Sequence, residues 1–144
     1  MTQERDIMIV GIALRTSNEE AMETIPALWG RFFSEGTLGK IPNKVNDEIV
    51  AVYTNFENEG VSNEGEYTLI IGVEVSSFDD IPEGMQSTTI VKQERLVFEV
   101  AEGKPENVGA TWHEVWGHAA NKTFIAEYEH YTQSGINIYI GVKS

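Results

Sequence analysis

Two glutamates and a histidine lie close together in one strand-like segment near the C-terminus, residues 124–131, with the sequence FIAEYEHY. Carboxylates at this spacing can hold a cation, or serve as a general base if burial raises their pKa. In an extended segment alternate side chains point to opposite faces, so Glu127, Glu129 and Tyr131 share one face with Ile125. Taken alone, the segment favours the exposed face of an antiparallel sheet, with both glutamates solvated.

Other chemistries are poorly supported. The chain has no cysteine, which excludes disulfides, thiolate metal sites and a cysteine nucleophile. His113, His118 and His130 do not have metal-ligand spacing, and we expect them to be solvated or to make ordinary hydrogen bonds. The sequence contains no glycine-rich phosphate loop, no nucleophile elbow and no zinc-binding helix motif. We therefore expect no cofactor, no metal and no assigned catalytic residue.

The charge balance limits the partners. The formal net charge is −13, from 23 acidic and 10 basic residues, and such a field repels phosphate backbones and anionic lipid while it attracts cations. We expect no direct binding to nucleic acid. No apolar run approaches the roughly 18 residues of a membrane span, and the polar N-terminus does not resemble a signal peptide. The expectation is a soluble, cytoplasmic protein that does not associate with membranes.

The elements that must position the glutamates are predicted from periodicity. The chain of 144 residues fits one domain, residues 1–144. Two amphipathic helices are predicted. The first has an apolar stripe from Ile25 to Phe33, with Thr24 as its N-cap and Gly36 as its terminator. The second has its stripe from Val108 to Ala119 and is capped by Asn107. About seven or eight strands surround them, in the segments 7–14, 48–56, 67–75, 85–91, 96–101, 124–131 and 136–142. The predicted class is α+β with a mostly antiparallel sheet and an acidic hairpin loop at 57–66.

The two halves match each other in three blocks. Residues 28–30 match 115–117, residues 49–56 lie over 124–131, and residues 71–74 lie over 140–143. The prediction is a duplicated β-α-β-β unit, at about 7–75 and 95–143, with pseudo-two-fold symmetry, one shared sheet and a groove between the halves. In this alignment Thr54 takes the place of Glu129. A carboxylate that only one copy carries is a candidate for function.

The order of several short motifs resembles a known family. They are Ile25 to Phe33, the strand containing Tyr53, Gly72 to Val75, Ile81 to Met85, and Tyr128 to Tyr131 before Ile138 to Ile140. Over essentially its whole length the chain is similar to the effector-binding domains of AraC-type and MerR-type multidrug-responsive transcription activators. It is also similar to their stand-alone relatives, the gyrase-inhibitor-like and integron-cassette effector-binding proteins. The family usually has Phe at the position of Tyr128.

The resemblance implies a groove that binds bulky, hydrophobic, often cationic compounds, with Glu129 as the buried carboxylate facing the ligand. Candidate wall residues are Tyr53, Tyr67, Trp29, Trp112, Trp116 and Tyr131, although both Trp29 and Trp116 lie on the main helical stripes and could instead pack in the core. The leading hypothesis is a stand-alone, non-enzymatic small-molecule-binding protein. The alternatives are a module that docks on a partner protein, as in gyrase-inhibitor-like relatives, and a hydrolase of reactive electrophiles with Glu129 as base. Glu127 is expected at the surface.

Overall fold

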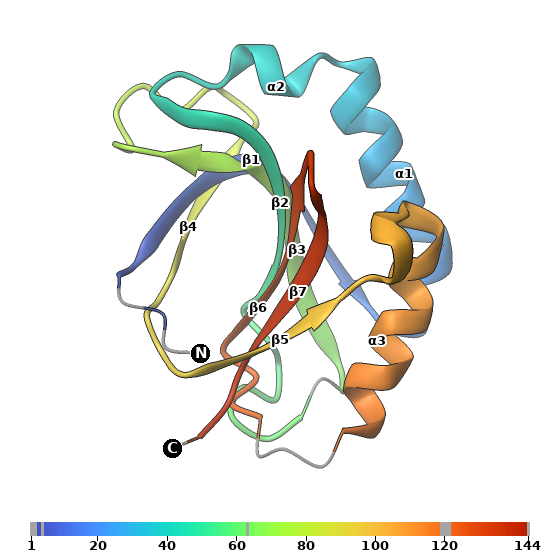
Figure 1. The fold of residues 1–144 in the computed structure, drawn as a ribbon. Coiled ribbons are helices and arrows are strands. Elements are labelled where there is room, and N and C mark those ends of the chain that lie inside the picture. Colours follow the sequence, from blue (N-terminus) through green and yellow to red (C-terminus); the bar gives the residue numbers. More distant parts are fainter. Residues whose placement is uncertain (1–2, 4, 63, 119–121, 144) are drawn as a thin grey trace.

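The structure is a computed structural model that describes residues 3, 5–62, 64–118 and 122–143. One antiparallel sheet of seven strands carries its helices on one face (Figure 1). The strands are β1 (Ile7–Ser17), β2 (Lys44–Thr54), β3 (Glu66–Val75), β4 (Gln86–Ile90), β5 (Arg95–Glu99), β6 (Ala126–Thr132) and β7 (Gly135–Gly141). The helices are α1 (Ala21–Ser34), the short α2 (Thr37–Lys40) and α3 (Val108–Gly117), and two 3-10 turns, Ala101–Gly103 and Pro105–Asn107, precede α3. The α+β class and the antiparallel sheet are confirmed.

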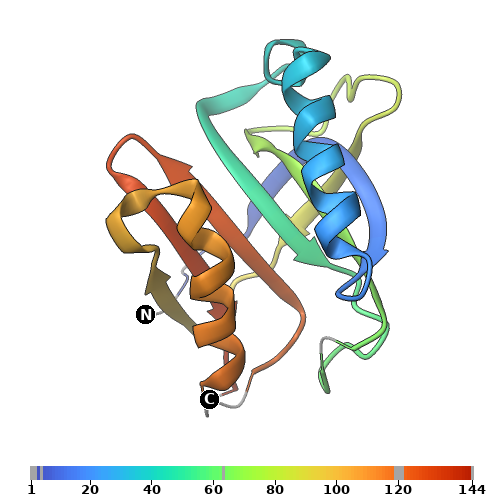
Figure 2. The ribbon, with the colours of Figure 1, turned by 90° about the vertical axis from the view of Figure 1, so that its right-hand side faces the viewer.

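The sheet order is β4-β1-β3-β2-β6-β7-β5. The three strands β1, β3 and β2 on one side are mirrored by β5, β7 and β6 on the other, and β2 pairs with β6 at the centre. Each set has its helix between its first and second strands in the chain, which is the expected β-α-β-β order. Figure 2 shows α1 and α3 lying over the same face of the sheet. Strand β4 lies outside this pattern, beside β1.

The helix boundaries differ in detail from those expected. Helix α1 begins at Ala21, so Thr24 lies inside it and is not the N-cap. The helix starts early because the carbonyl of Glu20 accepts the backbone N–H groups of both Glu23 and Thr24, at 3.0 and 3.1 Å. Gly36 follows the helix in the left-handed conformation, with φ of 62°, as a terminator does.

Helix α3 begins at Val108, directly after Asn107, as predicted. The Asn107 side chain does not cap the helix, however, because its amide donates to the carbonyl oxygen of Ala101 at 2.9 Å. Ala119, the last residue of the predicted stripe, lies outside the described residues.

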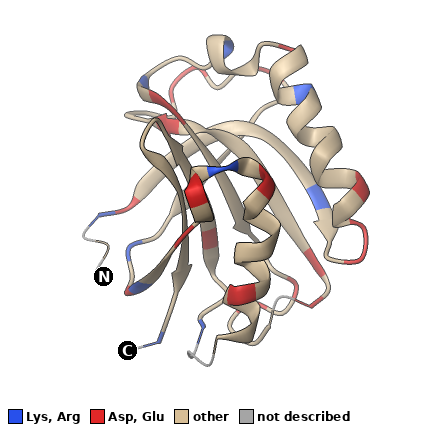
Figure 3. Ribbon diagram, turned by 45° about the vertical axis from the view of Figure 1, so that its right-hand side comes forward, with Lys and Arg blue, Asp and Glu red and all other residues tan. Residues whose placement is uncertain are grey.

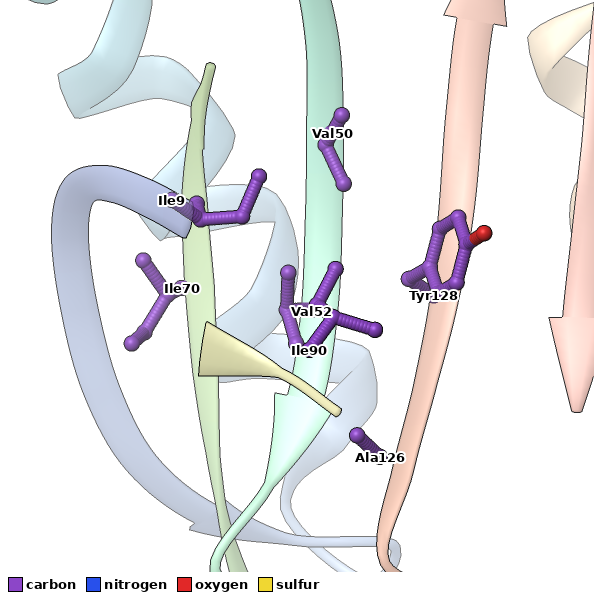
Figure 4. Packing of buried hydrophobic residues seen from close by; sticks show 7 residues of the cluster. All are labelled: Ile9, Val50, Val52, Ile70, Ile90, Ala126 and Tyr128. Atoms are coloured by element: carbon purple, nitrogen blue, oxygen red, sulfur yellow. The ribbon is translucent and has the colours of Figure 1, made fainter. Parts of the chain in front are cut away.

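A second apolar layer packs on the sheet face turned away from the helices. Figure 4 shows this cluster, which draws on five strands and consists of Ile9, Val50, Val52, Ile70, Ile90, Ala126 and Tyr128.

Polar contacts link the two edge strands, β4 and β5, across this side of the sheet. Arg95 of β5 donates to the carbonyl oxygens of Ala126 at 2.6 Å and Val91 at 3.2 Å. Gln3 accepts from Arg95 at 2.6 Å and donates to the carbonyl oxygen of Ile90 on β4 at 3.1 Å. Both faces of the sheet are thus covered, and side chains on the helix face can be buried.

Acidic residues are spread over loops, strands and both long helices, with few basic residues between them (Figure 3). The expected acidic loop is present between β2 and β3. Among the described residues, no helix combines the length and the apolar character needed to cross a membrane.

Candidate ligand-binding site

Glu129 lies at the centre of the sheet, on the face that carries the helices. On β6 it is opposite Ala51 of β2 and Ile138 of β7. Side chains alternate along a strand, so Glu127, Glu129 and Tyr131 all point to the helix side. Ala51, which packs under α1, is small enough to leave room beside the carboxylate. The side chain of Glu129 is 2% exposed.

Three donors hold the Glu129 carboxylate. Tyr131 Oη donates to Oε1 at 2.5 Å, while Tyr53 Oη and Trp112 Nε1 donate to Oε2 at 2.8 and 2.6 Å. These donors come from β6, β2 and α3, so both halves of the chain fix the same carboxylate. Hydrogen bonds to a charged group are about twice as strong as those between neutral groups, and they stabilise the ionised form.

Burial works against these hydrogen bonds. Desolvation raises the pKa of Glu129, and the bonds from Tyr131, Trp112 and Tyr53 lower it, with a net upward direction. Burial, and after it the negative charge of Glu129, raises the pKa of Tyr131 and Tyr53, so both phenols remain donors at neutral pH. A carboxylate in this position gains more from an added positive charge than a solvated one does, because little water competes for it.

A groove opens above Glu129, between α1 and α3. Its cavity volume is about 720 Å³, and Glu129 is its only acidic residue among the described ones. None of the described lining residues is basic, and most are apolar or aromatic. They are Ala21, Met22, Ile25, Pro26, Trp29, Phe33, Ile49, Tyr53, Pro105, Val108, Gly109, Trp112, Glu129 and Tyr131. The combination can accommodate a bulky hydrophobic cation.

Aromatic rings form the groove walls. Trp29 meets Tyr131 edge to face at 5.2 Å and stacks on Phe33 at 6.0 Å. Phe33 belongs to the predicted core stripe of α1, yet it is 65% exposed, because it lies on the groove side of the helix. On the other wall, Trp112 meets Tyr53 at 5.2 Å.

A second, smaller pocket of about 170 Å³ adjoins the groove at Tyr53 and Trp112, and we call it the inner chamber. The groove and the inner chamber are adjacent, because five residues line both of them. These residues are Ala21, Ile25, Tyr53, Gly109 and Trp112. The remaining lining residues of the inner chamber are Asn18, Phe56, Tyr67, His113, Trp116 and Glu127.

The seven predicted site residues therefore divide between two spaces. Glu129, Trp29 and Tyr131 line the groove, Tyr53 and Trp112 line both spaces, and Tyr67 and Trp116 line the inner chamber. Tyr67 is buried and its hydroxyl donates to Asn18 Oδ1 at 2.9 Å. Trp116 is 46% exposed, so it is not a core residue.

The expectation that Glu127 lies at the surface is wrong. Its side chain is 3% exposed and lines the inner chamber. Burial raises its pKa to about 7, and the charges of Lys122 and Arg95 partly offset that rise. Within the part of the chain that the structure describes, its Oε2 has no hydrogen-bond partner. The alternation of side chains along the strand already placed Glu127 on the same face as Glu129. This shared face was the signal in the sequence that Glu127 could be buried.

The proposed equivalence of Thr54 and Glu129 is also wrong. Gly72 of β3 matches Gly141 of β7, which makes Leu69 the counterpart of Ile138. Leu69 pairs with Tyr53, and Ile138 pairs with Glu129. Tyr53 is therefore the structural counterpart of Glu129. The alignment of β2 with β6 was displaced by one residue, which turns each side chain to the opposite face.

Metal chemistry finds no support in this region. Within the described segments, no group of three or more His, Asp and Glu side chains could hold a metal ion. His130 is an example. Its Nε2 lies 3.0 Å from Glu48 Oε1, and this is its one ion pair among the described residues.

A model of a known protein family matches nearly the whole chain. The model of the Cass2 family, described as integron-associated effector-binding protein, matches residues 1–142. Among curated proteins, no match was found.

Solved structures share the fold at low identity. An integron cassette protein from the mobile metagenome of Vibrio cholerae superposes with a TM-score of 0.74 at 19% identity, covering 98% of this chain and 93% of its own. The protein SAV2435, solved with bound tetraphenylphosphonium, gives 0.80 at 20% identity, covering 99% and 92%. A bacterial transcription regulation protein from Staphylococcus aureus MU50, so named without direct proof of its role, gives 0.74 at 19% identity, covering 99% and 95%.

Proposed function

Because the chain belongs to the Cass2 family of integron-associated effector-binding proteins, we propose that it binds a bulky hydrophobic cation in the groove between α1 and α3. Glu129 is the counter-charge in this proposal. The observation that carries it is a carboxylate, 2% exposed, at the floor of an apolar groove whose described residues include no basic side chain.

The energetics favour a cation over a neutral ligand. An ionised carboxylate removed from water costs several kcal/mol unless it is paired. Three hydrogen bonds offset part of this free-energy cost. A lipophilic cation offsets more of it, because such a cation loses little hydration on binding. Trp29, Trp112 and Tyr131 add cation–π and stacking contacts of roughly 0.5 to 2 kcal/mol each. Such contacts tolerate different ligand shapes.

The ligand of a neighbour structure agrees with this chemistry. SAV2435 holds tetraphenylphosphonium, a large hydrophobic cation without hydrogen-bond donors. A groove of about 720 Å³ lined by aromatic rings is of the size that drug-sized ligands occupy.

The geometry also supports binding rather than hydrolysis by Glu129. A general base must accept a proton from water or substrate. Three of the roughly four acceptor sites of the Glu129 carboxylate already hold protein hydrogen bonds, which stabilise the ionised form and make it a weaker base than an equally buried carboxylate without them.

Titration with tetraphenylphosphonium tests the proposal. Glu129→Gln keeps the shape of the side chain but removes its charge, and we expect affinity to fall by about 1.5 to 3 kcal/mol, or roughly 10- to 100-fold. Glu114→Gln is the matched control, because Glu114 is an exposed residue of α3 and its loss changes the net charge equally. Triphenylmethane, a neutral hydrocarbon with similar rings and no polar group, should bind wild type and Glu129→Gln alike. Equal affinity of wild type and Glu129→Gln for the phosphonium would refute the counter-charge role.

A further inference from the structure

Glu127 is a second buried carboxylate that the groove does not use. It lines the inner chamber, is 3% exposed, and its Oε2 lacks a hydrogen-bond partner among the described residues. Buried polar atoms are almost always paired, so an unpaired one facing a cavity marks a place where a donor fits. This makes Glu127 different from Glu129, whose two oxygens both accept hydrogen bonds.

The inner chamber restricts what such a donor can be. A volume of about 170 Å³ excludes a triaryl group but admits a compact ammonium or amidinium group. The chamber walls are mostly aromatic, with Phe56, Tyr67, Trp112 and Trp116 around the carboxylate. Aromatic faces attract cations, and a carboxylate at the end of such a chamber favours a positively charged donor.

The two carboxylates have a fixed spacing. Glu127 and Glu129 are two residues apart on one strand, which corresponds to about 7 Å along β6. Tyr53 and Trp112 line both spaces, and so do Ala21, Ile25 and Gly109, so the two spaces adjoin along shared walls. A ligand that fills the groove can therefore reach the inner chamber with a short, slender arm.

We infer that the inner chamber is a second cation subsite, in which Glu127 pairs with a compact ammonium or amidinium group carried on an arm of the ligand. The preferred ligands are then aromatic dications, with a bulky cationic body at Glu129 and a primary amine or amidine about 7 Å away. This inference rests on the proposed function of the groove.

Two matched ligands separate the inference from that function. Butyltriphenylphosphonium has the bulky cationic body and an apolar arm, and (4-aminobutyl)triphenylphosphonium ends the same arm in an ammonium group. Binding of the butyl compound tests the groove, and the ratio of the two affinities tests the inner chamber. We expect the amino compound to bind wild type about 10- to 100-fold more tightly. Equal affinities, or tighter binding of the butyl compound, would overturn the inference and leave the groove proposal standing.

Variants assign the effect to Glu127. Glu127→Gln should remove the preference for the amino compound and leave the affinity for the butyl compound within about twofold. Glu129→Gln should weaken both compounds and keep their ratio. A preference that persists in Glu127→Gln would show that the arm lies elsewhere. Glu127→Asp, which retains the charge, should retain part of the preference and covers the case in which the Gln variant folds poorly.

The pH dependence gives a readout on wild type alone. The charged and titratable groups that face or influence Glu127 are Arg95 on β5, Lys122, His113 on α3, Tyr53 on β2 and Tyr67 on β3. Since the pKa of Glu127 is raised to about 7, the preference for the amino compound should grow between about pH 6 and pH 8.5, where an alkyl ammonium remains charged. His113→Gln should show the same growth. A preference that does not change with pH, or whose change disappears in His113→Gln, would count against Glu127.

Discussion

Tyr53 and Glu129 occupy corresponding positions in the two halves of the sheet, and they are hydrogen-bonded to each other at 2.8 Å. Tyr53 lies opposite Glu127 in the β2–β6 pairing, but its hydroxyl donates a hydrogen bond to Glu129, the next residue of β6 on the same face. One half thus supplies the charge and the other supplies a donor that stabilises it.

Removing a donor should make Glu129 harder to ionise. Tyr131→Phe keeps the ring that contacts Trp29 but removes the hydrogen bond to Oε1. A hydrogen bond to a charged group contributes about 1.5 to 3 kcal/mol, so the pKa of Glu129 should rise by about one unit or more. The shift is measured as the displaced midpoint of tetraphenylphosphonium affinity against pH. Tyr67→Phe is the control, since Tyr67 donates to Asn18, and its midpoint should not move.

Cation binding should weaken as the pH falls. Burial raises the pKa of Glu129 above its ordinary value, so its charge is complete at high pH and is lost as pH falls through the raised pKa. Below that point the affinity for tetraphenylphosphonium should drop by up to about tenfold per pH unit. Calorimetric titrations across the range measure this slope. The profile of Glu129→Gln should be flat, and an equally steep profile in that variant would assign the proton to another group.

Glu127 should make the protein less stable at high pH. Its pKa in the folded protein is raised to about 7 from an ordinary value of 4.5, so the folded state holds the proton more tightly. The resulting stability is fully present below about pH 4.5 and is lost as pH rises through about 7, a change of about 3 kcal/mol.

Urea unfolding at about pH 5 and pH 8.5 checks this effect. Glu127→Gln should be more stable than wild type at the higher pH, and the difference between them should shrink at the lower pH. Glu114→Gln, an exposed residue, should follow wild type at both. A difference between wild type and Glu127→Gln that is independent of pH would show that Glu127 titrates alike in the folded and unfolded chain.

Strands β1 and β3 should tolerate no side chain where two glycines face each other. Gly11 pairs with Gly72, and a Cβ atom added to Gly72 would overlap the backbone carbonyl of Val10. Because backbone cannot move aside cheaply, Gly72→Ala should lower the free energy of unfolding by about 3 kcal/mol or more.

Gly30→Ala provides the contrast. Gly30 lies within α1 with open space around its Cα, so alanine there should stabilise the helix by about 0.5 to 1 kcal/mol. Thermal and urea unfolding measure both changes. Equal effects of the two substitutions would mean that the strands separate without cost.

Most of the fold could be predicted because it depends on local patterns. Alternation and short apolar runs located all seven strands, and the apolar stripes located α1 and α3. Boundaries were less predictable: β6 begins at Ala126 rather than at 124, since Phe124 has a positive φ of 50° and cannot continue a strand. The four-residue helix α2 is too short to produce a periodic signal.

The candidate site was predictable only in part. Resemblance to a family singled out Glu129, and its role in ligand binding stays a prediction. The burial of Glu127 was missed because alternation gives the face of a residue but not what covers that face, which here is the aromatic wall containing Trp112 and Trp116. The counterpart of Glu129 was misassigned to Thr54 because residue identities do not show strand pairing. Only the register of β2 with β3 and of β6 with β7 corrects it.

The symmetry of the sheet has one more consequence. If two identical, separate units paired through the strands that correspond to β2 and β6, the same residue would stand on both sides of the two-fold axis between them. A pair of tyrosines there would carry no charge, and a pair of glutamates in contact would have to share a proton. Joining the units in one chain lets the two positions differ, as Tyr53 and Glu129 do. A charged carboxylate from one unit that accepts a phenol hydrogen bond from the matching position of the other unit is thus available to a covalent duplication and closed to a symmetric homodimer.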